Sequence, residues 1–465
     1  MKILKWLGKG LLGLVLLIAV LVGALMLVPN YSQTIDVDFT RHLQALEAGG
    51  EPAEQNFFSV AGEGRVIIDG LAEGDSIGLT LNGAPVPLGA PAQGRIEAPV
   101  ALLADNTVTV VMNGGEASQA SLRIKQWQTI THHVAGRIHF NTNVSDFEAA
   151  RLFYRQLGFT SESGFPDANT LSMARAMGIY EPTEYDGSQG GEAGGYLLHG
   201  KIMGLEEFGT GSIDLIEYTI PRNDEPPYPN TNHIGMARAA MVTIDLDGDY
   251  ERMTAMGVEF LSAPVTRGDG QRFALFKDLD GTFYDLVEEE GDTKPDAPTQ
   301  ITHLGSLVFN VSDYERSAAW YRMMGYELDY ALPEEDSAEV AAAMGFEGHE
   351  GPVKLRGAVL KQVRDGSIMD LVQWIDPYDP SAPYPVPINH IGIARTALMS
   401  TDIEADVAML EAQGVELVSP LTPCCSGDDA SSYIIAFYDP DGTIVELASF
   451  PLVSKIFTVM SWFDE

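Results

Sequence analysis

The pattern of apolar and polar residues changes three times along the chain and divides it into four regions. Residues 10–28 form an uncharged apolar run, and residues 31–55 are polar and acidic. Residues 57–127 contain short runs in which apolar and polar residues alternate. From residue 133 to residue 450, β-type runs alternate with helical patterns. The pattern therefore predicts an apolar helix, a spacer, a small all-β region and a larger α+β region.

The apolar run has the length of a membrane-spanning helix. Its residues rise by about 1.5 Å each and give roughly 28 Å, close to the hydrocarbon thickness of a bilayer. Lys2, Lys5 and Lys9 precede the run, and flanking basic residues stay on the cytoplasmic side of a span. No small-x-small cleavage site follows it, so we expect an uncleaved anchor rather than a signal peptide. The bulk of the chain would then lie outside the inner (cytoplasmic) membrane.

Residues 57–127 predict a small β-sandwich. Their alternating runs at 65–70, 77–83 and 107–115 end in Asp-Gly or Asn-Gly pairs, which favour tight hairpin turns. The region holds no cluster of histidines, cysteines or paired carboxylates. We therefore expect it to act as a spacer or an interaction domain.

The larger region repeats one unit four times. In each copy an aspartate precedes a glycine by twelve residues: Asp146 and Gly158, Asp245 and Gly257, Asp313 and Gly325, Asp402 and Gly414. Aspartate favours the N-cap of a helix and glycine favours the left-handed residue that ends it. A β-type run follows each glycine, so the sequence predicts four strand-helix-strand units.

Longer matches group these units two by two. Residues 227–239 return as residues 383–396, and residues 276–286 return as residues 437–447 with an Asp-x-Asp-Gly turn in both copies. Matches of this length indicate that one domain was duplicated. The glycine-rich segment 187–195 has no full counterpart and predicts a mobile loop or lid over the first module.

Charge and cysteine content restrict the partners. The net charge is −38, and such a field repels nucleic acid and anionic membrane surfaces. The two cysteines, Cys424 and Cys425, are neighbours, so no disulfide framework and no zinc-type spacing is present. They are interpreted as two inert thiols on a loop, with a vicinal disulfide as the alternative.

The V-x-D helix start, the F-Y-x-x-x-G-F-like helix end and the closing D-P-D-G-x-x-x-E-L hairpin resemble the vicinal oxygen chelate superfamily. Its members include glyoxalase I, extradiol dioxygenases and bleomycin-resistance proteins. The resemblance covers residues 133–450 and implies an α+β fold of two tandem modules. Each module would pair two βαβββ units around a cavity. The predicted domains are therefore 1–30 (cytoplasmic N-terminus and anchor), 31–56 (spacer), 57–128 (β-sandwich), 129–292 (first module), 300–450 (second module) and 451–465 (apolar tail).

The resemblance also implies four inward positions per module, on the first and last strands of each unit. Metal-binding members carry histidine or carboxylate ligands there, because divalent metals need nitrogen or oxygen lone pairs. The corresponding residues are His139, Asp214, Arg238 and Asp285 in the first module, and Ser306, Asp370, Arg395 and Glu446 in the second.

These positions imply different roles in the two modules. The first module could hold one divalent metal through His139, Asp214 and Asp285. The second module offers two good ligands and is expected to be metal-free. An arginine at a ligand position repels a metal and can clamp a substrate anion. The predicted substrate-binding residues are Arg238, Arg395, Asp370 and Glu446. Glu217 is the spare carboxylate and the predicted catalytic base.

His233 and His390 each lie five residues before one of these arginines. An odd separation along a strand places two side chains on opposite faces. If the arginines point into the cavity, the histidines do not. We therefore predict that Asn-His-x-Gly forms a turn that enters the strand, with a catalytic histidine as the alternative.

Three functions remain open. The first is a membrane-anchored, extracytoplasmic, glyoxalase-like protein that binds a small anionic or aromatic molecule. The second is a lyase, isomerase or dioxygenase that uses a divalent metal in the first module. The third is a non-catalytic interaction or assembly protein. The glutathione adduct on which glyoxalase I acts is cytosolic, which disfavours that substrate for an extracytoplasmic protein.

The apolar residues 451–463 are expected to pack on the second module or touch the membrane surface.

Overall fold

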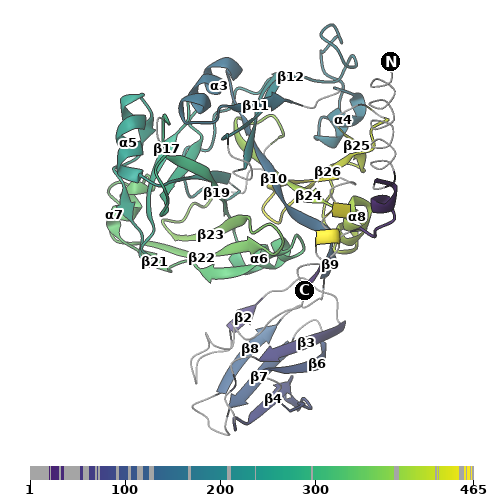
Figure 1. Cartoon of the computed structure of the whole chain (residues 1–465). Coiled ribbons are helices and arrows are strands. Elements are labelled where there is room, and N and C mark those ends of the chain that lie inside the picture. Colours follow the sequence, from purple (N-terminus) through teal and green to yellow (C-terminus); the bar gives the residue numbers. More distant parts are fainter. Residues whose placement is uncertain are drawn as a thin grey trace, which may run out of the picture.

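A computed structural model describes the larger α+β region almost completely and the N-terminal regions in part (Figure 1). The described residues are 20, 22–30, 33–35, 53–55, 62–68, 71, 74–90, 94–102, 106–112, 119–124, 130–165, 169–206, 211–235, 237–294, 297–381, 387–424, 427, 429–449, 455, 456, 458–460 and 462. None of the helices in these ranges is both long enough and apolar enough to cross a membrane. The predicted span lies mostly outside them.

All four repeated units are present. The first unit comprises β10 (Val134–Asn143), α3 (Phe147–Gln156), β11 (Ser161–Gly164), α4 (Leu171–Ala176), β12 (Leu197–Gly204) and β13 (Ser212–Ile220). The second comprises β14 (Ala237–Thr243), α5 (Leu246–Ala255), β15 (Glu259–Phe260), β16 (Val265–Thr266), β17 (Arg272–Lys277) and β18 (Phe283–Glu288).

The third and fourth units repeat the same order. The third comprises β19 (Ile301–Asn310), α6 (Tyr314–Arg322), β20 (Tyr326–Ala331), β21 (Glu335–Asp336), α7 (Ala338–Ala343), β22 (Val353–Gln362) and β23 (Ile368–Asp376). The fourth comprises β24 (Gly392–Ser400), α8 (Ile403–Ala412), β25 (Thr422–Pro423), β26 (Tyr433–Tyr438) and β27 (Ile444–Ser449).

The predicted helix boundaries are confirmed. Each predicted N-cap aspartate accepts a hydrogen bond from the backbone N–H three residues later. The four glycines that follow the helices have φ values of 109°, 90°, 81° and 73°. This left-handed region costs other residues steric strain. The spacing of aspartate and glycine therefore fixed both ends of each helix.

The units pair differently from the sequence expectation. The first sheet has the order β11-β12-β13-β10-β24-β27-β26-β25 and joins units one and four. The second sheet follows the path β15-β17-β18-β14-β19-β23-β22-β20 and joins units two and three. In both sheets the first strands of two units meet antiparallel, β10 with β24 and β14 with β19. The expectation that each consecutive module forms its own cavity is therefore wrong.

Consecutive units touch through a helix start and a hairpin instead. The backbone N–H of Ser145 donates to Asp280 at 3.0 Å, and its hydroxyl also donates to this carboxylate. The hydroxyl of Tyr154 donates to Asp278 at 3.0 Å. Units three and four repeat the contact, with Ser312 bonded to Asp441 and Tyr321 to Asp439. The helix start marked by V-S-D thus contacts the hairpin marked by D-x-D-G in the next unit.

The predicted small all-β region is confirmed below the larger body in Figure 1. A five-stranded sheet has the order β2-β8-β7-β4-β5, and a separate pair is β3-β6. Residues of β3 and β6 share one hydrophobic cluster with residues of β4 and β7. The strands are β2 (Ala53–Gln55), β3 (Gly62–Ile68), β4 (Ile77–Leu81), β5 (Ala84–Pro85), β6 (Ile96–Leu102), β7 (Asn106–Met112) and β8 (Gln119–Ile124).

One further strand pair connects the start of the chain to the larger body. β1 (Gln33–Ile35) pairs antiparallel with β9 (Ile130–His132).

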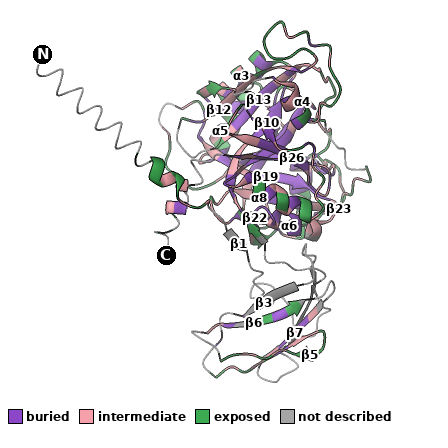
Figure 2. Ribbon diagram, turned by 90° about the vertical axis from the view of Figure 1, so that its right-hand side faces the viewer, coloured by how far each residue is buried: buried purple, intermediate pink, exposed green. Residues whose placement is uncertain are grey.

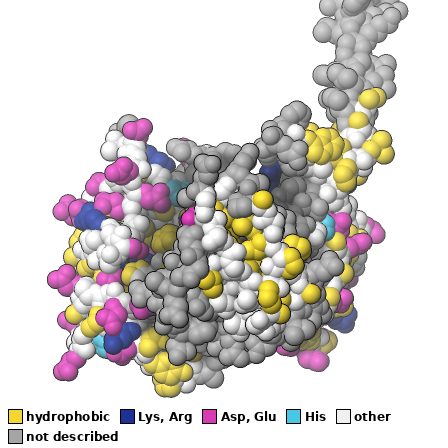
Figure 3. All heavy atoms as spheres, turned by 90° about the horizontal axis from the view of Figure 1, so that it is seen from below, with side chains coloured by type: hydrophobic (Ala, Val, Ile, Leu, Met, Phe, Trp, Pro, Cys, Tyr) yellow, Lys and Arg dark blue, Asp and Glu magenta, His cyan; other side chains and the backbone are white. Residues whose placement is uncertain are grey.

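Burial is concentrated in the strands of the two large sheets (Figure 2). Acidic side chains are spread around the face seen from below and basic ones are few there (Figure 3), as the net charge of −38 predicts.

The cysteine prediction is corrected by the structure. Cys424 is disulfide-bonded, so the interpretation as two thiols is wrong and the disulfide alternative holds.

The segment 187–195, predicted as a mobile loop or lid, is hydrogen-bonded to the start of α4. Glu192 N–H donates to the carbonyl of Asn169 at 3.0 Å, and the Glu192 carboxylate accepts from Leu171 N–H at 2.7 Å.

We expect the replacement Asp278→Asn to change how stability depends on pH. Burial raises the pKa of Asp278 to about 6, compared with about 3.9 in an unfolded chain. The folded chain binds this proton more tightly, so the contribution to stability is complete below about pH 4 and is lost as the pH rises through about 6. In urea titrations, the unfolding free energy of the variant minus that of wild type should rise by up to about 3 kcal/mol between about pH 4 and 7.

The matched control is Asp292→Asn, because Asp292 is exposed. This control should keep the pH dependence of the wild type. Parallel stability curves for Asp278→Asn and wild type would contradict the assignment.

Candidate functional site

The first sheet brings together four polar side chains from units one and four. They are His139 on β10, Asp214 on β13, Arg395 on β24 and Glu446 on β27. These are first-strand and last-strand positions, as the sequence predicted, but they come from the two outer units of the chain. We call them the first cup.

One network links the four residues of the first cup. His139 Nε2 lies 3.1 Å from Asp214 Oδ2, and Arg395 Nε lies 3.2 Å from Glu446 Oε2. Asn141 connects the two pairs, because its Oδ1 accepts from Arg395 Nε at 2.8 Å and its Nδ2 lies 3.5 Å from Asp214 Oδ2. Asn141 pairs with Asp214 on one neighbouring strand and with Arg395 on the other.

Each residue of the first cup nevertheless carries a buried polar atom that makes no hydrogen bond to another described residue. These atoms are His139 Nε2, Asp214 Oδ1, Arg395 Nη1 and Glu446 Oε2. The short distances of His139 Nε2 and Glu446 Oε2 to their neighbours lack hydrogen-bond alignment. A buried polar group left unpaired costs about 1–3 kcal/mol. These four atoms are available to bond a water molecule or a ligand.

Burial also changes the protonation of this cup. It lowers the pKa of His139 to about 4, although the negative charge of Glu446 opposes the change. It raises the pKa of Asp214 to about 7, against the opposing charge of Arg395. At neutral pH His139 is uncharged, whereas Asp214 exists in both protonation states. The pair can therefore accept or donate a proton near neutral pH.

A cavity of about 770 Å³ reaches the first cup. His139 lines it together with Ser161, Ser163, Ile202 and Ser212. The side chain of His139 keeps 14% of its surface exposed, whereas that of Asp214 keeps 4%. His139 therefore lies between the cavity and the buried part of the network.

The second sheet carries the equivalent residues Arg238, Asp285, Ser306 and Asp370, which we call the second cup. Arg238 Nε donates to Asp285 Oδ1 at 2.9 Å, and Ser306 Oγ donates to Asp370 Oδ2 at 3.0 Å. Arg267 Nη2 lies 4.0 Å from Asp285 Oδ2, and its guanidinium lies 4.4 Å from the centre of the Phe273 ring.

The second cup is largely satisfied by its own contacts. Among the described side chains of this cup and its neighbour Arg267, one buried polar atom has no hydrogen-bond partner, and it is Arg267 Nε. Burial raises the pKa of Asp370 to about 6, against the opposing charge of Arg267. Two guanidinium groups thus face two carboxylates, which leaves little unbalanced charge for a ligand.

The structure separates the predicted metal ligands. His139 and Asp214 lie in the first cup, and Asp285 lies in the second, where it binds Arg238. Arg395 and Glu446 lie together, as do Arg238 and Asp370. The predicted grouping by consecutive units is therefore wrong. The first strands of units one and four pair with each other, and so do those of units two and three.

Glu217 is not part of either cup. Its Oε2 accepts from Phe147 N–H at 3.1 Å in the first turn of α3, and its Oε1 lies 3.4 Å from Arg222 Nη1. Glu217 also lines a separate cavity of about 690 Å³ beside the segment 187–195. It lies three positions after Asp214, and this odd offset places it on the opposite face of β13.

Sequence reasoning missed Asn141 and Arg267. Asn141 follows His139 by two residues on β10, so the period of a strand would have placed it on the same face. Arg267 lies in the connection between β16 and β17, where no periodic pattern marks an inward position.

The two repeated histidines lie outside the cups. Asn310 Nδ2 donates to the carbonyl of His233 at 2.9 Å, and Asn143 Nδ2 donates to the carbonyl of His390 at 2.8 Å. These bonds hold the predicted turns at the entry to β14 and β24. His233 Nδ1 lies 3.3 Å from Asp379 Oδ2.

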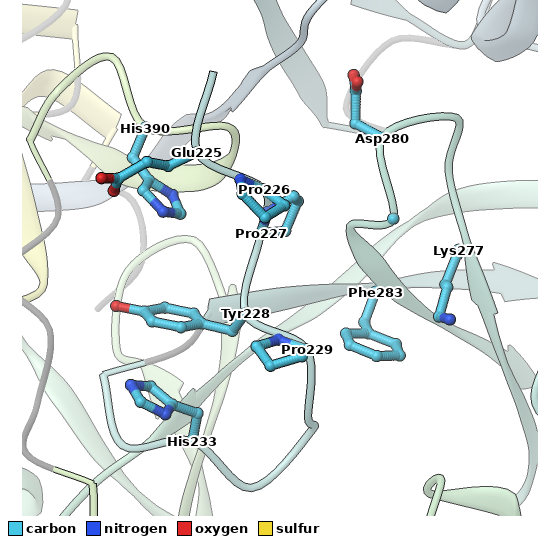
Figure 4. Close-up of a pocket in the computed structure, with 11 residues that line it drawn as sticks. Glu225, Pro226, Pro227, Tyr228, Pro229, His233, Lys277, Asp280, Phe283 and His390 are labelled. Atoms are coloured by element: carbon cyan, nitrogen blue, oxygen red, sulfur yellow. The ribbon is translucent and has the colours of Figure 1, made fainter. Parts of the chain in front are cut away.

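Both histidines line a third cavity of about 750 Å³ (Figure 4). The Tyr228 ring stacks on His233 with centres 4.2 Å apart and lies 5.7 Å from His390. Figure 4 shows prolines on one side of the open space, and Phe283 and Lys277 on the other. The cavity is an apolar slot between loops of the two sheets.

Comparison with known proteins agrees with this architecture. The profile of the Glyoxalase/Bleomycin resistance protein/Dioxygenase superfamily matches residues 132–284 and 300–447. The chain belongs to this superfamily. Nothing among curated proteins matches the chain.

The chain is also similar to solved structures of glyoxalases, at low identity. Glyoxalase I from Zea mays is 16% identical, with 69% of this chain and 94% of that chain covered and a TM-score of 0.45. A glyoxalase family protein from Bacillus cereus is 18% identical, with 31% and 91% covered and a TM-score of 0.27.

Members of this superfamily often bind divalent metals, but the donor set here does not fit one. Arg395 holds the fourth position of the first cup and keeps its guanidinium against Glu446. Within the described ranges, no three or more histidine, cysteine, aspartate or glutamate side chains are grouped closely enough to hold a metal ion. We therefore derive no chemical step through a metal.

We expect Arg238→Met to destabilise the chain by about 3–5 kcal/mol, because it leaves the buried carboxylate of Asp285 without its main partner. The double variant Arg238→Met/Asp285→Leu removes both charges and should recover most of the loss. Chemical denaturation of wild type, both single variants and the double variant gives the coupling energy. Additive single effects would show that the pair is not coupled.

Proposed function

We propose that this chain is a membrane-anchored, extracytoplasmic, glyoxalase-like protein that binds a small, oxygen-rich anion in its first cup. The observation that carries the proposal is the set of four buried polar atoms on His139, Asp214, Arg395 and Glu446 that make no hydrogen bond to another described residue. His139 also lines a cavity of about 770 Å³, which is the proposed route of the ligand into the cup. The second cup, with its paired charges, then has a structural role.

The free atoms indicate the chemistry of the ligand. Arg395 Nη1 can donate to a carboxylate or carbonyl oxygen, because an arginine never loses its proton in a protein. Glu446 Oε2 can accept a hydroxyl proton, and the His139–Asp214 pair can do either. A small molecule with a carboxylate or carbonyl beside a hydroxyl satisfies this pattern. Tyr196 and Tyr218 lie close enough to Arg395 to interact with its charge, which also suits an aromatic substituent.

A second candidate is a lyase or isomerase that moves a proton without a metal. Asp214 has a pKa of about 7 and lies 3.1 Å from the uncharged His139, which suits a general base. The guanidinium of Arg395 can stabilise the negative oxygen that forms when a proton leaves the carbon beside a carbonyl. Glu217, the base predicted from the sequence, lies on the other side of β13.

The proposed location rests on the sequence. Residues 10–28 are apolar and long enough to span a bilayer, and Lys2, Lys5 and Lys9 precede them. The positive-inside rule then places the cups outside the cytoplasm. Ligands for the first cup would therefore come from the extracytoplasmic space.

We expect small 2-hydroxy acids, with glycolate, lactate and mandelate as probes, to raise the melting temperature of the chain. Arg395→Gln should weaken binding at least tenfold, because a charge-assisted hydrogen bond is worth more than about 1.4 kcal/mol. Ser306→Ala, at the position in the second cup that corresponds to His139, is the matched control and should bind like wild type. Equal loss in both variants would locate binding elsewhere, and an effect of EDTA would favour a metal.

Anion affinity should depend on pH through Asp214. Its pKa of about 7 means that the cup loses a negative charge as the pH falls through neutrality. The dissociation constant of mandelate, measured by calorimetry, should therefore be several-fold lower at about pH 6 than at about pH 8. Asp214→Asn should remove this dependence, and an unchanged dependence in that variant would assign it to another group.

A further inference from the structure

Two apolar segments from distant parts of the chain are joined beside α8. The first contains residues 22–30, and the second contains residues 455, 456, 458–460 and 462, which we call the 455–462 segment. Thr458 Oγ donates to the carbonyl of Pro29 at 2.9 Å, and Lys455 Nζ donates to Asn30 Oδ1 at 2.6 Å. Asn30 Nδ2 also donates to Asp402, the N-cap of α8, at 2.7 Å. The 455–462 segment is therefore fixed to the point where the predicted membrane span ends.

These two segments expose an unusual share of apolar surface. They and the adjoining Val20 hold seven of the fourteen large hydrophobic side chains that are exposed within the described ranges: Val20, Val22, Met26, Leu27, Ile456, Met460 and Trp462. Figure 3 shows hydrophobic side chains gathered where the N-terminal segment joins the body. A contiguous apolar surface of this kind marks a contact with another phase or molecule.

The 455–462 segment has a clear direction. Ile456 and Met460 both lie in helical backbone, and both side chains are exposed. Thr458, between them, is buried and bonds to Pro29. Trp462 follows on the exposed side with 58% of its surface accessible. The polar contacts thus hold the segment to the body and leave its apolar side chains outward.

The position of the segment identifies what covers it. If residues 10–28 span a bilayer, the lipid headgroups lie at Pro29, because the apolar run ends there. A segment bonded to Pro29 and Asn30 must then lie at the same depth. Tryptophan is enriched at this boundary, where one part of its ring is apolar and the other is wet. A net charge of −38 excludes attraction to anionic lipid, so the contact is apolar.

We propose that residues 455–462 form a membrane-surface clasp, which inserts Ile456, Met460 and Trp462 into the lipid boundary beside the anchor. The inference rests on the proposed membrane anchor. The clasp gives the folded body a second, fixed contact with the bilayer. A single span joined by a flexible linker would leave the orientation of the body free.

The test uses the full chain reconstituted into phosphatidylcholine vesicles, with lipids brominated close to the headgroup or deep in the acyl chain. Bromine quenches tryptophan at the same depth. The shallow label should quench wild type more strongly than Trp462→Phe. The other four tryptophans, Trp6, Trp127, Trp320 and Trp374, are present in both samples, so the difference between the samples reports Trp462 alone.

A second variant tests the face rather than the reporter. Met460→Ser should reduce the shallow quenching of Trp462, whereas Leu279→Ser, which removes an apolar side chain exposed elsewhere on the body, should leave it unchanged. Flotation of the same samples tests the anchor independently.

The outcomes separate the two ideas. Flotation together with loss of shallow quenching in Trp462→Phe supports the clasp. Flotation with identical quenching in wild type and Trp462→Phe overturns the clasp and leaves the anchor. A chain that does not float overturns the anchor and the clasp together, and ligand binding in the first cup is unaffected.

Discussion

The architecture depends on which strand edges meet. Each unit has a first strand whose outer edge carries unpaired N–H and C=O groups, and an exposed edge of this kind pairs with another strand. β10 meets β24 and β14 meets β19, so the chain closes on itself with unit one against unit four. The bonds of Asp280 with Ser145 and of Asp441 with Ser312 hold consecutive units together at the same time. Edge pairing and hairpin docking therefore use different surfaces of one repeated unit.

This division of contacts decides the composition of each cup. Had consecutive units shared a sheet, His139 and Asp214 would have shared a cup with Arg238 and Asp285. The observed pairing also gives each cup one arginine, but it sets Arg395 and Glu446 against His139 and Asp214, and Arg238 and Asp285 against Ser306 and Asp370. Arg267 then adds a second cation to the second cup alone. A duplicated domain has thereby produced one cup with unsatisfied polar atoms and one with balanced charges.

Much of the fold follows from local sequence rules. The Asp-to-Gly spacing predicted both ends of four helices, because capping and left-handed glycine are short-range effects. His390 lies outside the first cup, as predicted, because it belongs to the turn before β24 and not to the strand. The partner of a strand edge is different, since periodicity shows which face is apolar and not which strand lies beside it. The sequence therefore predicted Arg395 and Glu446 as inward residues but grouped them with the wrong neighbours.

An arginine in place of a metal ligand changes what the fold can do. A divalent metal holds two oxygens of a ligand through open coordination positions, whereas a guanidinium offers directional N–H donors in one plane. Arg395 Nε donates to Asn141, and the buried Nη1 makes no hydrogen bond to another described residue. Arg395 Nη1 is thus oriented in the absence of a ligand. The folded chain already carries the free-energy cost of leaving this donor without a partner. Such preorganisation favours planar oxygen groups, and the neighbouring Asp214, which titrates near neutral pH, adds a proton that a metal cage would not have retained.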